Sequence, residues 1–107
     1  MEAVLDPILD RIVNTLTREF DVRRIVLFGS RAMGTNRVDS DYDVLVEVAS
    51  DIPYWERQQR GYAAFGLRDW GLDLIIKTGP EMDRSRQLLG SVANTADSEG
   101  RVIYART

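Results

Sequence analysis

The chain has 107 residues, a net charge of −3 at neutral pH, and neither cysteine nor histidine. This composition excludes disulfides, thiolate metal sites, histidine-ligated zinc and every histidine-based catalytic triad. Acid–base and metal chemistry must therefore come from carboxylates, tyrosines, lysine or water, and such an inventory suits a hard cation such as Mg²⁺.

The length fits a single domain, residues 1–107. No apolar run approaches the roughly 20 residues that a membrane span needs, and the acidic, amphipathic first ten residues do not resemble a signal peptide. We therefore expect a cytoplasmic protein with no membrane partner. Thirteen of the 14 basic residues are arginines. With a negative overall charge, this favours local phosphate contacts over a general nucleic-acid surface.

The first predicted element is a helix with Asp6 as its N-cap and Pro7 at its first position. Apolar residues then recur at helical spacing as far as Phe20. A short β-branched run at residues 24–28 predicts a buried strand that ends in a Gly-Ser turn. One helical turn at residues 31–33 and a loop complete this half of the chain.

Alternation along residues 42–48 predicts a second strand, with Asp41, Asp43 and Glu47 on the face opposite to Tyr42. A helix is predicted at 53–69, a strand at 71–77, a helix at 81–98 and an edge strand at 102–104. The order α-β-β-α-β-α-β predicts an α+β fold, a small mixed sheet flanked by helices, and leaves the strand order open.

Two groups of apolar side chains are expected to face the core of this fold. The helix at 53–69 carries an aromatic stripe, which is better explained as core than as a platform for stacking bases. The helix at 81–98 carries aliphatic residues that we place inward in the same way. The residues are Tyr54, Trp55, Tyr62 and Phe65 in the first group, and Leu88, Leu89 and Val92 in the second.

The stretch from Gly29 to Glu47, GSRAMGTNRVDSDYDVLVE, carries the chemistry. Asp41 and Asp43 project from one face of a strand, about 7 Å apart along the chain. Like charges held so close repel, and a divalent cation compensates them; two-metal sites of this kind serve nucleotidyl displacement. Gly29 and Ser30 offer backbone N–H groups and a hydroxyl as a phosphate cradle.

Asp73 is the third candidate carboxylate, because it interrupts an otherwise apolar strand where an unpaired charge is costly. If that strand lies beside the Asp41–Asp43 strand, the three acids meet. The alternative for Asp73 is a buried ion pair with an arginine, and Arg31 is either a phosphate ligand or a plain loop cation. A P-loop is excluded, since residues 35–36 lack the required Lys and Ser or Thr.

These residues resemble the signature of the nucleotidyltransferase superfamily of the DNA polymerase beta type. That signature is a Gly-Ser pair, a spacer near ten residues, Asp-x-Asp, and a later Asp in a strand. The matching positions are Gly29, Ser30, Asp41, Asp43 and Asp73. Within the superfamily, the chain is similar to minimal nucleotidyltransferases without an appended domain, many of which are antitoxins paired with a helical HEPN toxin.

The resemblance implies two Mg²⁺ ions and ATP as the donor. It implies that Asp41 and Asp43 hold the metals and that Asp73 holds the catalytic metal and accepts the attacking hydroxyl's proton. Gly29 and Ser30 would contact the β and γ phosphates, assisted by Arg31. The implied reaction moves AMP to a tyrosine hydroxyl of a partner HEPN toxin. Neutralisation by contact alone is the alternative, and modification of a small molecule such as an aminoglycoside ranks lower.

Overall fold

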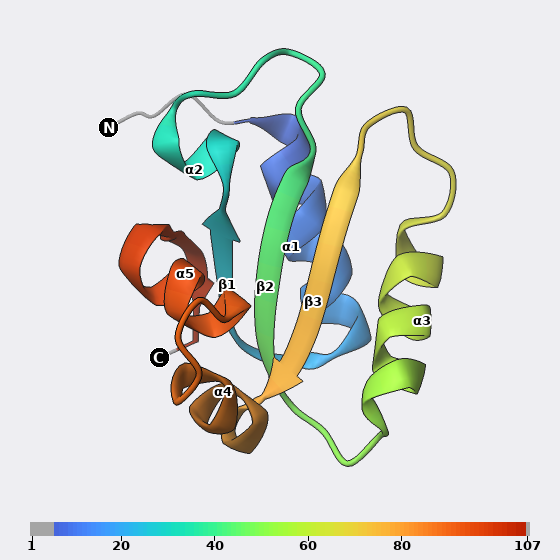
Figure 1. The fold of residues 1–107 in the computed structure, drawn as a ribbon. Coiled ribbons are helices and arrows are strands. Elements are labelled where there is room, and N and C mark those ends of the chain that lie inside the picture. Colours follow the sequence, from blue (N-terminus) through green and yellow to red (C-terminus); the bar gives the residue numbers. More distant parts are fainter. Residues whose placement is uncertain (1–5, 107) are drawn as a thin grey trace.

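The structure is a computed structural model that describes residues 6–106 (Figure 1). Its helices are α1 (Pro7–Glu19), α2 (Ser30–Met33), α3 (Tyr54–Phe65), α4 (Gly79–Arg86) and α5 (Val92–Glu99). Its strands are β1 (Asp21–Phe28), β2 (Tyr42–Ala49), β3 (Leu72–Thr78) and β4 (Arg101–Ala105).

The strands form one sheet in the order β3-β2-β1-β4. β1 runs antiparallel to both β2 and β4, whereas β2 and β3 run parallel. This confirms the predicted α+β fold with a small mixed sheet, and it supplies the strand order that the sequence pattern left open. The parallel register places Asp43 directly beside Asp73.

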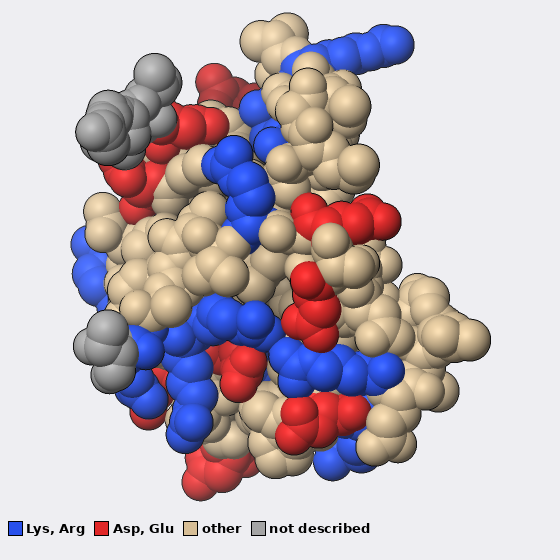
Figure 2. Space-filling model, turned by 90° about the vertical axis from the view of Figure 1, so that its left-hand side faces the viewer, with Lys and Arg blue, Asp and Glu red and all other residues tan. Residues whose placement is uncertain are grey.

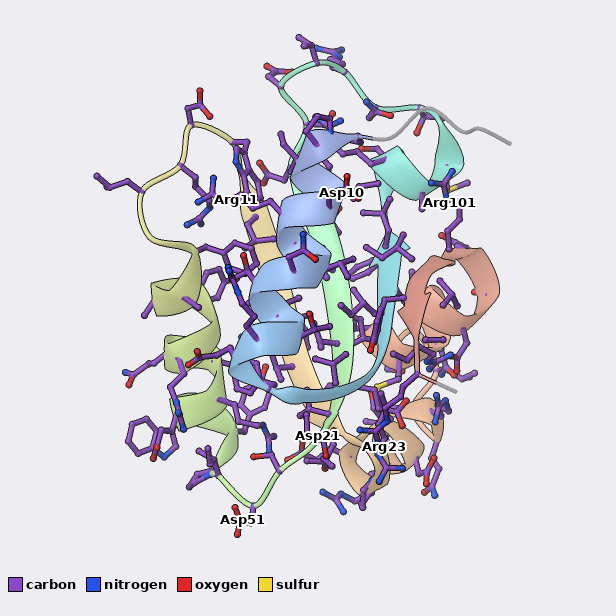
Figure 3. All side chains as sticks on the ribbon, turned by 180° about the vertical axis from the view of Figure 1, so that it is seen from behind. Asp10, Arg11, Asp21, Arg23, Asp51 and Arg101 are labelled. Atoms are coloured by element: carbon purple, nitrogen blue, oxygen red, sulfur yellow. The ribbon has the colours of Figure 1, made fainter. Side chains whose placement is uncertain are left out.

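Helices cover both faces of the sheet, which gives three layers. α1 and α3 pack on one face, and α4 and α5 pack on the other (Figures 1 and 3). Ile12 and Leu16 of α1 are fully buried against the first face, as the helical spacing predicts. Leu45 and Met82 centre the smaller core on the second face. No helix in residues 6–106 is long and apolar enough to cross a membrane.

The start of α1 is fixed by the predicted cap. The Asp6 carboxylate accepts a hydrogen bond from the backbone N–H of Ile8 at 2.9 Å, and Pro7 occupies the first helical turn. The same carboxylate accepts a 2.6 Å hydrogen bond from the Tyr42 hydroxyl. The N-cap therefore also anchors the first residue of β2, next to the acidic motif.

Side chains of α3 shield the exposed edge of β3. The Gln58 amide donates to the Leu74 carbonyl at 2.8 Å and accepts from the Ile76 N–H at 2.7 Å, while the Tyr62 hydroxyl accepts from the Leu74 N–H at 2.8 Å. Gly61 permits this approach, because a Cβ there would lie 2.5 Å from the Ile76 Cδ1 atom. These bonds satisfy edge groups that another strand would otherwise pair with.

The structure corrects two predicted helices. The helix at 53–69 ends at Phe65, because Gly66 turns the chain with a φ of 63°. The predicted helix 81–98 is two helices, and the connection contains Gly90 with a φ of 75°. That conformation suits glycine and ends helical geometry.

Several side chains that were expected inward are exposed instead. Leu88 and Leu89 lie in the connection between α4 and α5 and are 65% and 100% exposed, and Trp55 on α3 is 62% exposed. Phe65 is buried and Tyr62 packs against the core, so only part of the aromatic stripe faces inward.

A buried arginine joins α3 to α4. Arg57 is 2% exposed; it donates to the Ile52 carbonyl at 2.9 Å and forms an ion pair with Glu81. Burial by itself raises the pKa of the Glu81 carboxyl, but hydrogen bonds from Arg57 and Thr78 outweigh burial, so the pKa is lowered overall. Glu81 also completes a capping box with Thr78 at the start of α4.

We expect Glu81→Gln to destabilise the fold by about 3 kcal/mol at pH 7, because Arg57 would remain buried without a counter-ion. Because the pKa of Glu81 is lower folded than unfolded, the stabilisation is complete above the unfolded value of 4.5 and disappears as pH falls below it. Urea denaturation at pH 7 and at lower pH measures both effects. Exposed Glu99→Gln is the matched control, and equal stability of the two variants would contradict the prediction.

Candidate active site

The predicted acidic residues lie on the sheet face that carries α4 and α5, at the end of the sheet that these helices leave open. Asp43 of β2 and Asp73 of β3 are register partners on adjacent parallel strands, so their side chains project from the same face. Asp41 precedes β2 by one residue. Burial raises the pKa of the Asp43 carboxyl, and the charges of Asp73 and then Asp41 raise it further. The charges of Asp73 and Asp41 therefore both act on the Asp43 carboxyl.

Two of these carboxylates rest directly against glycines. A Cβ atom on Gly29 would lie 2.1 Å from the Asp43 Oδ2 atom, and one on Gly71 would lie 1.8 Å from the Asp41 Oδ1 atom. Any side chain at either position would displace a carboxylate. The sequence pattern gave Gly71 only as the start of a strand; its place two residues before Asp73, on the same face, is the signal that could have identified it.

The Gly-Ser turn lies at the end of β1, beside the acids. Phe28 pairs with Asp43 across β1 and β2, and the next residue, Gly29, begins the short helix α2. The Gly29 carbonyl accepts hydrogen bonds from the Ala32 and Met33 N–H groups at 3.1 and 3.2 Å. Gly29 has a φ of 72°, a left-handed conformation that favours glycine. The structure thus brings Gly29, Ser30 and the carboxylates together, at the end of the sheet where α2 lies in Figure 1.

Arg31 organises the loop that leads to Asp41. Its Nε donates to the Ser40 carbonyl at 3.0 Å, its Nη2 donates to the Val38 carbonyl at 3.2 Å, and its Cζ lies 4.0 Å from the centroid of the Tyr42 ring. These contacts already occupy the guanidinium. The contact of Arg31 with phosphate stays a prediction.

Tyr42 completes this arrangement from β2. Burial raises the pKa of its hydroxyl to about 12, helped by the hydrogen bond to Asp6 and the Asp6 charge, and Arg31 partly opposes the shift. The hydroxyl therefore stays protonated and donates to Asp6 throughout the physiological range. Asp6 and Arg31 together hold Tyr42 from two sides, which fixes the backbone between Asp41 and Asp43.

Glu47 lies on the same face as the candidate acids but belongs to a separate ion-pair network. Its carboxylate lies 3.5 Å from Arg24, which also pairs with Asp97 of α5 at 3.6 Å. Asp97 in turn binds Arg86 of α4 at 2.6 Å. The sequence placed Glu47 only on this face of the strand; the structure shows that it also helps to hold α4 and α5 on the sheet. On the side of the molecule in Figure 2, acidic and basic groups are interleaved, which interrupts any continuous positive surface.

The donor set suits a hard divalent cation. Within residues 6–106, no Lys or Arg lies within ion-pair distance of Asp41, Asp43 or Asp73, so their oxygens are not committed to a protein cation. Among the described residues, no three candidate ligands lie close enough together to hold a metal ion without a change in side-chain conformation. Adjacent strands are about 4.8 Å apart, so side-chain rotation alone can bring neighbouring carboxylates onto one ion. The buried ion pair considered for Asp73 is not observed there, and Asp73 is exposed.

Comparison with known families decides the class of protein. Residues 9–93 match the model of the nucleotidyltransferase domain family. The chain belongs to this family. The matched segment of the nucleotidyltransferase contains Gly29, Ser30 and all three candidate carboxylates.

The nucleotidyltransferase is similar to characterised proteins at the level of sequence and fold. It is 32% identical over 91 residues to the protein adenylyltransferase MntA of Thermococcus cleftensis, which covers 82% of this chain and 89% of the relative. Its fold resembles a toxin–antitoxin crystal structure with AMP-PNP, with a TM-score of 0.61 and 22% identity, over 92% of this chain and 74% of that one. It also resembles a complex of tri-AMPylated Shewanella oneidensis HEPN toxin with MNT antitoxin, with a TM-score of 0.51 and 19% identity, over 92% and 70% of the two chains.

Proposed function

We propose that this nucleotidyltransferase moves AMP from ATP to an acceptor hydroxyl in a Mg²⁺-dependent reaction. The acceptor oxygen attacks the α-phosphorus of ATP, the bond from that phosphorus to the bridging oxygen breaks, and pyrophosphate leaves. The observation that carries the proposal is the juxtaposition of Asp43, Asp73 and the Gly29 turn at one end of the sheet. The adenylyltransferase name of the Thermococcus relative supports AMP as the transferred group.

The roles of individual residues follow from their positions. Asp41 and Asp43, each lying against a glycine backbone, would hold the metal ions, and Asp73 would share the catalytic ion. Bound Mg²⁺ lowers the pKa of the attacking hydroxyl and neutralises charge on the leaving pyrophosphate. Asp73 is exposed, so an acceptor can reach it, and its carboxylate would take the hydroxyl proton. The backbone N–H groups and hydroxyl at Gly29 and Ser30 would bind the leaving phosphates.

The acceptor that we propose is a tyrosine hydroxyl of a helical HEPN toxin, whose modification silences the toxin. The support comes from the relatives: one solved complex pairs an MNT antitoxin with a tri-AMPylated HEPN toxin, and another toxin–antitoxin structure holds AMP-PNP, an analogue of ATP. The nucleotidyltransferase would then act as the antitoxin of such a pair.

Transfer of a radiolabel tests the proposal. ATP labelled at the α-phosphate is incubated with Mg²⁺, the protein and a lysate of its source cells, in parallel with the Asp43→Asn variant. We expect one labelled protein band that needs Mg²⁺ and is missing with the variant, and mass spectrometry would identify the modified tyrosine. If wild type and variant leave the lysate proteins equally unlabelled, transfer to a protein tyrosine is refuted, and neutralisation by contact or a non-protein acceptor takes its place.

A further inference from the structure

A pocket of about 330 Å³ lies at the end of the molecule opposite to α2, where the start of α3, the end of β3 and α4 meet (Figure 1). The lining residues are Tyr54, Lys77, Glu81, Arg84, Ser85 and Leu88. The last four of these recur at helical spacing, so α4 and the turn that follows it form one side of the pocket. None of the residues assigned to transfer lines this pocket, and the proposed function leaves it unexplained.

Apolar side chains around this pocket are exposed. Tyr54 and Leu88 line the pocket and are both exposed, and so are the residues that follow them in the chain, Trp55 and Leu89. We call these four residues the α3–α4 patch. Exposed apolar side chains that lie singly are common, but a group of them marks a site where another molecule binds. Aromatic residues are also enriched where proteins bind one another.

The pocket is positively charged, although the whole protein has a net charge of −3. Its one acid, Glu81, is neutralised by the ion pair with buried Arg57. Its two cations, Lys77 and Arg84, have no carboxylate within ion-pair distance among residues 6–106. Lys77 Nζ lies 5.3 Å from the centroid of the Tyr54 ring, so a cation lies beside an aromatic ring. The complement of this surface is therefore both acidic and apolar.

Two features favour a peptide over a nucleotide as the acidic ligand. Phosphates commonly bind to free backbone N–H groups at the start of a helix, but the capping box of Thr78 and Glu81 occupies such groups at the start of α4. A single base would also stack on one aromatic ring and leave the more distant apolar side chains, Trp55 and Leu89, exposed. An amphipathic helix, which presents apolar residues every three or four positions, can cover them together.

We propose that the α3–α4 patch, with Lys77 and Arg84 beside it, is a docking surface for an acidic amphipathic helix of a partner protein. An apolar side chain of that helix would fill the pocket, and its carboxylates would pair with the two cations. The inference goes beyond the proposed function, because docking at this surface requires neither ATP nor Mg²⁺ and uses none of the residues assigned to transfer.

Titration of ¹⁵N-labelled protein with two synthetic peptides tests this docking surface. One peptide is acetyl-EELEEFLEEL-amide, and the other has lysine in place of every glutamate and the same apolar residues. In low-salt buffer with EDTA, we expect the acidic peptide to shift the amide resonances of Lys77, Arg84 and Leu88 most. Measured at these resonances, it should bind at least about tenfold more tightly than the lysine peptide.

Substitutions separate the apolar and the charged contributions. Leu88→Ser should weaken binding of the acidic peptide about tenfold, because the apolar contact in the pocket is lost. Leu67→Ser is the matched control and should leave the affinity unchanged, since Leu67 is also exposed but follows the opposite end of α3. Arg84→Gln should weaken binding about threefold, and added salt should reduce this difference from wild type.

Three results would overturn the docking surface: no shift at Lys77 and Arg84 with the acidic peptide, equal affinity for the two peptides at these residues, or equal losses from Leu88→Ser and Leu67→Ser. AMP is titrated in parallel, and larger shifts at the same residues with AMP than with the acidic peptide would mean that the pocket binds a nucleotide instead. Shifts there that grow with protein concentration alone would identify a second copy of this chain as the occupant and would also overturn the proposal.

Discussion

Asp43→Asn is expected to abolish AMP transfer and, at the same time, to make the metal-free protein more stable at pH 7. The loss of transfer follows from the removal of a metal-binding charge, and we expect a decrease of at least about 100-fold. The gain in stability follows from the raised pKa of Asp43, which burial and the charges of Asp73 and Asp41 produce. A carboxyl with a raised pKa costs stability as pH rises through that pKa, and neutral Asn removes the cost.

Thermal and urea denaturation in EDTA measure this second effect, which we expect to be about 0.5–1 kcal/mol. Added Mg²⁺ should raise the melting temperature of the wild type and leave that of the variant unchanged. Asp51→Asn is the control, because Asp51 is exposed in the turn between β2 and α3, at the opposite end of the molecule from α2 (Figure 3). A variant that is less stable than wild type in EDTA would show that the acids do not repel one another.

Gly29→Ala should reduce the rate of transfer about 100-fold, whereas Gly66→Ala should change it less than threefold. Both glycines have similar backbone conformations that favour glycine, with φ and ψ of 72° and −159° at Gly29 and of 63° and −147° at Gly66, so both variants bear a similar backbone cost of about 1–3 kcal/mol. Only the methyl group at Gly29 meets Asp43, at 2.1 Å, whereas nothing lies within 4 Å at Gly66. A displacement of about 1 Å at a reacting centre can cost 100-fold in rate.

Initial rates of label transfer at saturating ATP measure this difference, and circular dichroism verifies that both variants fold. The pair separates backbone strain from displacement of the carboxylate, because strain is common to both variants. Equal rates for Gly29→Ala and Gly66→Ala would mean that contact between Gly29 and Asp43 has no part in catalysis.

Local patterns predicted the elements whose signals are periodic. The apolar spacing after Asp6 and Pro7 gave α1 with its cap, and the alternation from Tyr42 gave β2 with the correct faces. The strand order could not be obtained in this way, because it depends on contacts between distant residues, such as the pairing of Asp43 with Asp73. Periodicity describes one element at a time and does not specify its neighbour.

The errors have a common physical origin in residues whose environment is set by tertiary contacts. Apolar spacing placed Leu88 and Leu89 inward, but Gly90 turns the chain there and leaves both exposed. Arg57 was not singled out, since a charged residue is rarely buried without a partner, and its partner Glu81 lies 24 residues further along the chain.

For the candidate site, the motif predicted that the acids and the Gly-Ser turn lie together, but it did not predict the residues that support them. Asp6 and Tyr42 are 36 residues apart in sequence, and nothing in either segment predicts their hydrogen bond. Asp41 contacts the backbone of Gly71 only because β3 lies beside β2, so the sequence pattern does not predict this contact. The grouping of these residue types was therefore predictable from the sequence, whereas the packing that orients them was not.

The hydrogen bonds from α3 to β3 also fix the register of the strand that carries Asp73. Gln58 and Tyr62 bind the backbone of Leu74 and Ile76, so they fix which residues of β3 can lie beside β2. A slip by one residue would turn Asp73 into the core under α1 and α3 and expose the leucine next to it. This misfolded state would be destabilised twice, by the buried charge of Asp73 and by the loss of these hydrogen bonds. A chain that has folded stably has therefore already placed Asp73 on the same face as Asp43.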